Sequence, residues 1–509
     1  MSKLEVQESF SRRYLVKIVS SVLIALLNVI VQLLLPRVFT IEEYGYYSYN
    51  LNVFSSVVTV FNLSASNALV SKFSKKNDED GYVQFYLRFF AIISLILNIG
   101  IILLFPTSFI HTSFTGQTIF VILLGLNASI VRKLLTDMVS VFDAMALSRL
   151  PALWQIIQKI IITICVVLGY YFGILNIYVF YIFQIITIGG ISIFLIVQFF
   201  CIHKNKYKFS LRKKNVEYIS EFFVFCRPLV FATIFDQIII LAKNWALMHW
   251  SGISSSALFG AAWQLNIIIS YIFSPYAELM KREFAVIHRD TDELNHRIIQ
   301  SLKIMAWLIS FFCIFIVINA KDVLLFLFGQ KYENGVLITQ IIMIYTIYQA
   351  WGQILGSFML AVEKTRASSI ISVFANCFSL LLIYFFQCPN FIWKNGLGVN
   401  GMAYSYAIVN FFSVSLLLLY ITRLMKLSFL KLAIIPLISM TICFIISFIV
   451  NSVFMQLIPD NSQIVRFVRI MCGGFSYSII ILLLLWNCPK IIGIDKKNII
   501  MKLAFKKNP

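Results

Sequence analysis

Long apolar stretches alternate with short polar segments along the chain as far as about residue 486. Each stretch holds roughly twenty residues or more, the length that an α-helix needs to cross a hydrocarbon core of about 30 Å. The pattern predicts membrane-spanning helices at fourteen places: residues 14–35, 45–70, 82–105, 118–142, 152–172, 176–200, 219–246, 255–277, 300–319, 336–362, 367–387, 399–421, 430–450 and 464–486.

The basic residues are distributed unevenly between the loops on the two sides. With the N-terminus inside, the inner loops hold most of the lysines and arginines, and the outer loops hold Arg37, Lys321, Lys331 and Lys394. A missed or additional helix would reverse the side of every later loop and destroy this asymmetry. The sequence therefore predicts an all-α polytopic membrane protein of about fourteen helices with both termini in the cytoplasm.

The composition agrees with this prediction. The chain has 509 residues, of which 60% are hydrophobic and 13% are charged, whereas soluble domains carry about 25% charged residues. The net charge of +20 would indicate nucleic-acid binding in a soluble protein. Here the basic residues lie in loops between apolar stretches, so we expect the lipid bilayer as their partner and no nucleic acid.

A weak internal repeat recurs at an offset of about 215 residues. Glu43-Tyr44-Gly45 corresponds to Leu258-Phe259-Gly260, and Arg149 corresponds to Arg366. Six crossings return the chain to the same side, so the repeat predicts two parallel six-helix lobes. The predicted organisation is an N-lobe at 1–200, a basic cytoplasmic linker at 201–218, a C-lobe at 219–421, and two further helices with a basic tail at 422–509.

Several short segments carry a resemblance to a known family. They are Leu35-Pro36-Arg37 followed by Glu43-Tyr44-Gly45-Tyr46-Tyr47, Arg227-Pro228-Leu229 with Asp236, Leu325-Phe326-Leu327-Phe328-Gly329 with Lys331-Tyr332, and Gly398-Val399-Asn400-Gly401-Met402-Ala403. With the six-plus-six-plus-two plan, the chain resembles polysaccharide-export flippases of the Wzx type. These belong to the multidrug/oligosaccharidyl-lipid/polysaccharide (MOP) exporter superfamily.

The resemblance implies a flippase and not an enzyme. The implied substrate is an undecaprenyl-pyrophosphate-linked oligosaccharide, such as an O-antigen, capsule or exopolysaccharide repeat. Two lobes would move it across a bacterial inner membrane by alternating access around a cationic cavity. The resemblance implies no cofactor or metal. Coupling to H+ or Na+, and association with a polysaccharide polymerase complex, stay open.

A pyrophosphate head needs cations inside the membrane, because moving an isolated charge into hydrocarbon is very costly. Nine basic residues fall within the predicted helices: Lys17, Arg88, Arg132, Lys133, Lys159, Arg227, Lys243, Arg466 and Arg469. Four of these, Lys17, Lys243, Arg466 and Arg469, lie near helix ends, where long side chains reach the interface. The remaining five are the candidate pyrophosphate ligands.

Arg132 and Lys133 are the deepest of the candidates. Lys133 and Asp137 are four residues apart, which predicts an ion pair. Arg132 shares a helix face with Thr136, Ser140 and Asp143. We expect Arg132 to be available for phosphate and Lys133 to be held by Asp137. The alternative interpretation is a structural salt bridge buried between helices.

The predicted seventh helix carries a further acid, Asp236, between Arg227 and Lys243. Asp236 is expected either to pair with Arg132 or Lys243 or to bind a coupling ion. With Asp137 and Asp143 it completes the candidate ion-pair or coupling residues.

The sequence leaves three alternative functions to consider, and the third is disfavoured. A multidrug extruder (MATE) of the same superfamily would need inward-facing acids for cationic drugs, whereas the two deepest adjacent charges here are basic. A lipid II flippase shares the fourteen-helix plan and an anionic substrate. A membrane enzyme is disfavoured, because the chain has neither an HExxH motif nor a nucleotide-binding glycine loop.

Overall fold

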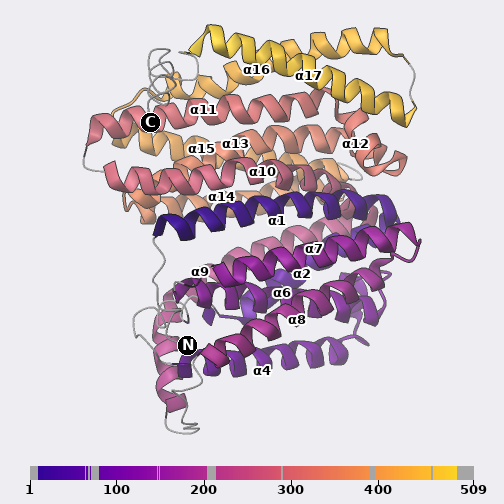
Figure 1. The fold of residues 1–509 in the computed structure, drawn as a ribbon, viewed down its shortest axis with the longest axis vertical. Helices are drawn as coiled ribbons and strands as arrows, with labels where there is room; N and C mark the ends of the chain where they lie inside the picture. The colour runs from indigo at the N-terminus through magenta and orange to yellow at the C-terminus, as the bar shows by residue number, and fades with distance from the viewer. Residues whose placement is uncertain are drawn as a thin grey trace. The chain divides into compact units, whose positions relative to one another are not determined.

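The computed structural model describes residues 10–63, 65–66, 69, 80–145, 147, 149–202, 214–287, 290–389, 391, 396–459 and 462–489. These residues form helices and contain no β-strand (Figure 1). Fourteen helices in the described part of the chain are long, and the shortest of these has 21 residues. Ten of them are individually long and apolar enough to span a membrane. The predicted all-α polytopic fold is confirmed.

The chain divides into two compact units, residues 1–257 and 258–509. The helices of the first unit are α1 (Phe10–Val38), α2 (Ile41–Phe61), α4 (Asp80–Leu104), α5 (Ser108–Ser113), α6 (Ile119–Ala144), α7 (Arg149–Tyr171), α8 (Ile177–Ile202) and α9 (Lys214–Ser251). Helix α6 packs against α2, α4 and α8, and α7 packs against α1 and α8. Helix α9 packs against α2, α4 and α5, which places it with the first unit. The sequence-based boundary at residues 201–218 stays a prediction.

Helix α10 (Ile253–Ile287) begins in the first unit and lies mostly in the second. The second unit continues with α11 (Thr291–Ile318), α12 (Ala320–Phe328), the 3-10 helix η1 (Gln330–Gly335), α13 (Val336–Ala361), α14 (Thr365–Gln387), α15 (Gly398–Leu424), α16 (Phe429–Leu457) and α17 (Gln463–Asn487). Helix α13 packs against α11 and α15, and α14 packs against α15. A short helix precedes the fourth long helix of each predicted set of six, α5 before α6 and α12 before α13.

Local capping explains where several helices begin. Thr40 and Glu43 form a capping box at the start of α2, with bonds of 3.0 and 3.1 Å between side chain and backbone. The Asp290 side chain accepts hydrogen bonds from Asp292 and Glu293 and starts α11. Helix α11 therefore begins about two turns before the predicted boundary at residue 300, because the cap lies in a polar segment that hydropathy alone does not register.

Gly45 shows why the first resembling segment needs a glycine. A Cβ atom at this position would lie 2.5 Å from the backbone oxygen of Ile253. No real Cβ tolerates that approach, so only glycine lets α2 lie this close to the start of α10.

Polar contacts join the C-terminal helices α16 and α17 to other helices of the second unit. The Ser439 and Ser310 hydroxyls lie 3.0 Å apart, which joins α16 to α11. On α17, the Arg469 Nε lies 2.9 Å from Asp322 of α12, and the Arg469 side chain is 2% exposed. Arg469, which the sequence places near a helix end, is thus buried against a carboxylate from another helix.

Removing the Asp322 carboxylate should destabilise this attachment. Asp322→Ala leaves the buried Arg469 without its partner, and breaking a buried pair in this way costs about 3 kcal/mol. We expect a lower melting temperature in detergent. The control is Glu333→Ala, since Glu333 pairs with Lys321 at 2.7 Å but both side chains are more than half exposed. The hydrogen bond and charge of Lys321 lower the pKa of Glu333, yet an exposed pair contributes little stability. Equal melting of the two variants would contradict a buried role for Asp322.

Candidate functional site

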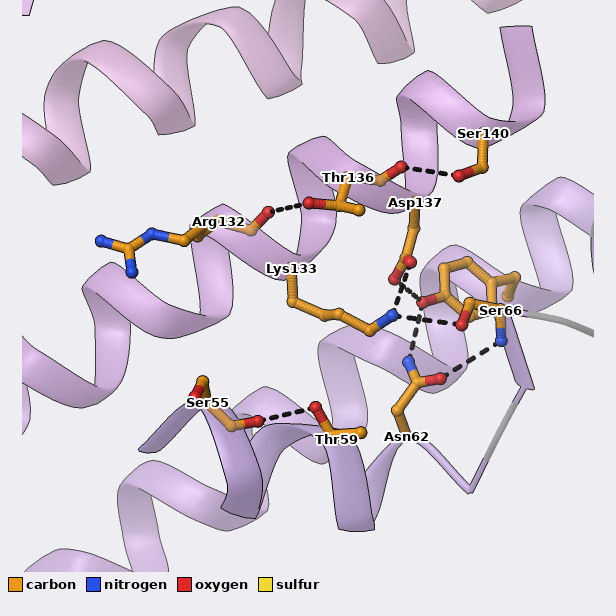
Figure 2. A network of polar contacts seen from close by, with 10 residues as sticks. Ser55, Thr59, Asn62, Ser66, Arg132, Lys133, Thr136, Asp137 and Ser140 are labelled. Atoms are coloured by element: carbon orange, nitrogen blue, oxygen red, sulfur yellow. Dashed lines mark hydrogen bonds and ion pairs between the residues drawn. The ribbon is translucent and has the colours of Figure 1, made fainter. Parts of the chain in front are cut away.

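Helix α6 carries two adjacent cations that point to different sides. Figure 2 shows Lys133 reaching toward Asp137 and Ser66, while Arg132 extends away from them. Successive residues of an α-helix are separated by about 100°, so neighbouring side chains necessarily enter different surroundings. Arg132 is 13 residues from one end of α6 and 12 from the other, roughly 18–20 Å at the helical rise. The sequence-predicted pair therefore separates into two sites.

Lys133 belongs to a closed ring of hydrogen bonds, which we call the Lys133 ring: Asn62, Ser66, Tyr86, Lys133 and Asp137. Lys133 donates to Asp137 at 2.7 Å and to the Ser66 hydroxyl at 3.1 Å. The Ser66 backbone N–H donates to the Asn62 side-chain oxygen at 3.2 Å. Asn62 donates to the Tyr86 hydroxyl at 2.8 Å, and Tyr86 donates to Asp137. Every member thus has two neighbours, and the Lys133–Asp137 pair expected from the spacing is present.

The ring depends on the end of α2. Residues 45–70 were predicted as one helix, but α2 ends at Phe61, Asn62 is its C-cap, and Leu63 has a φ of 50°. A left-handed residue cannot continue an α-helix, so the chain turns there and hydrogen bonds from Ala65 back to Asn62. The turn brings Asn62 and Ser66 onto the side of α6 that carries Lys133. The end of α2 at Phe61 and the turn that follows it therefore place two members of the ring.

The Lys133 ring is electrically balanced. Asp137 is 3% exposed, and the one positive charge of Lys133 faces the one negative charge of this carboxylate. Tyr86 and Asn62 are buried as well. A buried pair with its remaining lone pairs satisfied is stable, whereas either partner alone is costly. The contacts fit the structural interpretation of Lys133 and Asp137.

Arg132 has different surroundings. Its Nη2 donates to the Gln184 side-chain oxygen on α8 at 3.1 Å. Lys159 on α7 is close enough for the two positive charges to repel each other. Both side chains are half-buried, and no ion pair joins either of them to a carboxylate in the described part of the chain. We call Arg132 and Lys159 the cation pair.

Lys159 lies deeper than the sequence indicated. Helix α7 begins at Arg149 and ends at Tyr171, so Lys159 is at least ten residues, or about 15 Å, from either end. Two uncompensated cations near the middle of membrane helices each cost about 2.5–3.5 kcal/mol on insertion scales. Cations at this depth mark a candidate functional position, and an anionic ligand would offset their cost.

The remaining predicted site residues lie at other positions of the first unit. Arg88 is exposed on α4, about 200° around the helix from the buried Tyr86. Asp143 is half-buried near the end of α6, and Asp236 is exposed on α9. Arg227 lies within α9, and its side chain falls outside the described residues.

Three members of the Lys133 ring were missed by sequence reasoning. Tyr86, Asn62 and Ser66 are polar groups on predicted helices, but many such residues serve helix contacts. The available signal was the unusual polarity of Asn62 and Ser66, which share a helical spacing of four just before a charged loop.

Similarity to known proteins is found among solved structures. No family model matches the chain, and no curated protein sequence matches it. Among solved structures, the chain is similar to the lipid II flippase MurJ in an inward closed conformation, with a TM-score of 0.69, 17% identity, and coverage of 93% of this chain and 99% of that one. It is also similar to an inward-facing multidrug resistance MATE family transporter of the MOP superfamily, with a TM-score of 0.55, 12% identity, and coverage of 82% and 96%.

The chain has the MOP transporter fold. At these identities the likeness shows the fold alone. The match covers 99% of the MurJ structure and 96% of the MATE structure. The protein is a multi-pass membrane protein, and both named neighbours are transport proteins.

Proposed function

We propose that this MOP-type protein flips an undecaprenyl-pyrophosphate-linked oligosaccharide repeat from the inner to the outer leaflet. The substrate would be an O-antigen, capsule or exopolysaccharide unit, and the membrane the bacterial inner membrane with both chain termini in the cytoplasm. Two lobes, divided at the basic linker 201–218, would alternate in access. The observation that carries the proposal is the cation pair, because an anionic substrate matches two uncompensated positive charges inside membrane helices.

The two cations differ in what they offer a pyrophosphate. The Arg132 guanidinium is a planar fork that binds two oxygens at once, whereas the Lys159 ammonium is a point charge. Gln184 orients the Arg132 fork through its side-chain oxygen. We assign pyrophosphate binding to Arg132 and Lys159, with Arg88 and Arg227 as outlying cations along its path. Lys133, the fifth predicted pyrophosphate ligand, is paired with Asp137 in the Lys133 ring.

The acids take a different part in the proposal. Asp137 neutralises Lys133 in the ring. Asp236 and Asp143 are the remaining candidates for ion pairing or for binding a coupling H+ or Na+. In the described residues, no group of three or more histidine, cysteine or acidic side chains is arranged to hold a metal ion.

A lipid II flippase is the second candidate, because a solved structure similar to this chain carries that name. Such a flippase would share the fourteen-helix plan and an anionic substrate. A MATE-type antiporter for cationic drugs is disfavoured, since the cation pair would repel such a substrate.

Deletion of the gene tests the proposal. Loss of surface polysaccharide, with completed lipid-linked repeats accumulating on the cytoplasmic side, is the expected result, and restoring the gene should reverse it. Accumulation of lipid II with cell lysis would indicate the second candidate. Intact surface glycan together with altered sensitivity to cationic dyes would reject the flippase proposal in favour of a drug extruder.

A further inference from the structure

The second unit contains a cluster of four aromatic side chains. We call it the ring layer, and it consists of Phe259 and Trp263 on α10, Tyr345 on α13 and Tyr406 on α15. The Trp263 ring centroid is 5.4 Å from those of Tyr345 and Tyr406 and 5.6 Å from that of Phe259. All four side chains are half-buried. Part of each residue is therefore accessible, which is unlike the fully buried aromatic residues of the cores.

Amide side chains lie one helical turn after the rings on each of the same three helices. Asn266 follows Trp263 by three residues, and Gln349 and Asn410 follow Tyr345 and Tyr406 by four. Residues at these spacings share a helix face. We call Asn266, Gln349 and Asn410 the amide layer. The three helices thus repeat one pattern, a ring followed by an amide.

Hydrogen bonds fix the positions of the amides. Asn266 donates to the Thr346 hydroxyl and to the Gln349 side-chain oxygen, both at 2.8 Å. Asn410 donates to the Tyr345 backbone oxygen at 3.0 Å. With its oxygen engaged by Asn266, Gln349 still has two N–H donors in its side-chain amide. The amide layer is consequently pre-positioned, and Gln349 presents donors from a half-buried position.

The three helices that carry the two layers are uncharged along them. Helix α10 has no charged residue from Ile253 to Ala277, α13 has none, and α15 has only Arg423 in its last turn. These three helices offer a phosphate no cation beside the two layers, and they offer an organic cation no carboxylate there. Rings for stacking together with amides for hydrogen bonding match a neutral, hydroxyl-rich ligand.

We infer that the ring layer and amide layer form a carbohydrate-binding site that takes the sugar part of the substrate. The inference rests on the proposed function for the identity of that substrate. Rings pack against the C–H faces of a pyranose, and the Gln349 amide hydrogen-bonds its hydroxyls. The proposed contacts to the glycan thus come from other residues than the cation pair assigned to the pyrophosphate.

The test uses the purified full-length protein in detergent and a defined probe, oligosaccharides prepared by partial hydrolysis of the source cells' own surface polysaccharide. Binding is measured by saturation-transfer difference NMR. Trp263→Ala and Tyr406→Ala should each weaken binding by about tenfold or more, as loss of a central aromatic contact does. Trp263→Phe keeps a ring and should stay within about threefold of wild type. Trp486→Ala is the control, because Trp486 is 66% exposed on α17.

Each alternative has its own signature. Unchanged binding in Trp263→Ala and Tyr406→Ala would overturn the inference, as would tetraphenylphosphonium competing with the oligosaccharides. An equal loss in Trp263→Phe and Trp263→Ala would also overturn it, because the effect would then be one of packing. The probe is available whatever the deletion strain accumulates. The two proposals can therefore fail separately. Glycan binding can persist when the deletion strain rejects the flippase function, and glycan binding can be unaffected by the variants when the flippase function holds.

Discussion

Arg132→Ala is expected to abolish restoration of surface glycan in a deletion strain while the protein remains in the membrane at its normal level. The reason is that Arg132 is a mid-helix cation whose hydrogen-bond partner on α8 is the neutral Gln184, so its removal deletes the fork assigned to pyrophosphate. The measurement is surface-glycan staining together with immunoblotting of the membrane fraction. Lipid-linked repeats should accumulate in the variant as they do in the deletion strain.

Two further variants sharpen this prediction. Arg132→Lys keeps the charge and loses the bidentate geometry, so partial export would indicate that charge suffices, and no export would indicate that the fork is required. Arg423→Ala removes an exposed arginine at the end of α15 and should export normally. Normal glycan in Arg132→Ala would remove this residue from the mechanism.

Asp137→Ala is expected to cause the largest loss of stability in the first unit. Lys133 would keep its charge inside the helices while losing its counter-ion, and Tyr86 would lose its acceptor. Breaking a buried pair in this way costs about 3 kcal/mol or more. The variant should melt at a lower temperature in detergent and give a lower yield. Glu293→Ala is the matched control, because Glu293 is an exposed acid paired only at 3.8 Å with Arg297.

A double variant tests whether the Lys133–Asp137 pair has a structural role or a role in transport. Lys133→Met/Asp137→Leu removes both charges together, and replacing a buried pair with apolar residues is often close to neutral for stability. If the pair is structural, the double variant should recover both melting temperature and glycan export. Recovery of stability without export would show that Lys133 itself contacts the substrate.

The fold was largely predictable because hydropathy and the positive-inside asymmetry both act over whole segments. The fourteen predicted helices correspond in order to the fourteen long helices of the structure. Helix ends were less predictable, since they depend on single residues. The Asp290 cap extends α11 beyond its apolar stretch, and the left-handed Leu63 ends α2 inside one.

The Lys133–Asp137 pair was predictable, because a spacing of four is local information. Tyr86 and Gln184 were not, since their contacts with α6 come from residues 51 and 52 positions away. Burial of Arg469 against Asp322 has the same origin, with a separation of 147 residues. Hydropathy places a residue in a membrane segment but does not say which neighbour that residue meets.

The closure of the Lys133 ring has a consequence for how this protein can evolve. Because every member bonds to two others, a single substitution leaves a buried donor or acceptor unmatched next to it, and most such steps are disfavoured. Change at these positions is then expected to occur in compensating pairs. Arg132 stands one residue away in the sequence and outside the ring, so selection can alter it with the substrate while the framework beside it stays fixed.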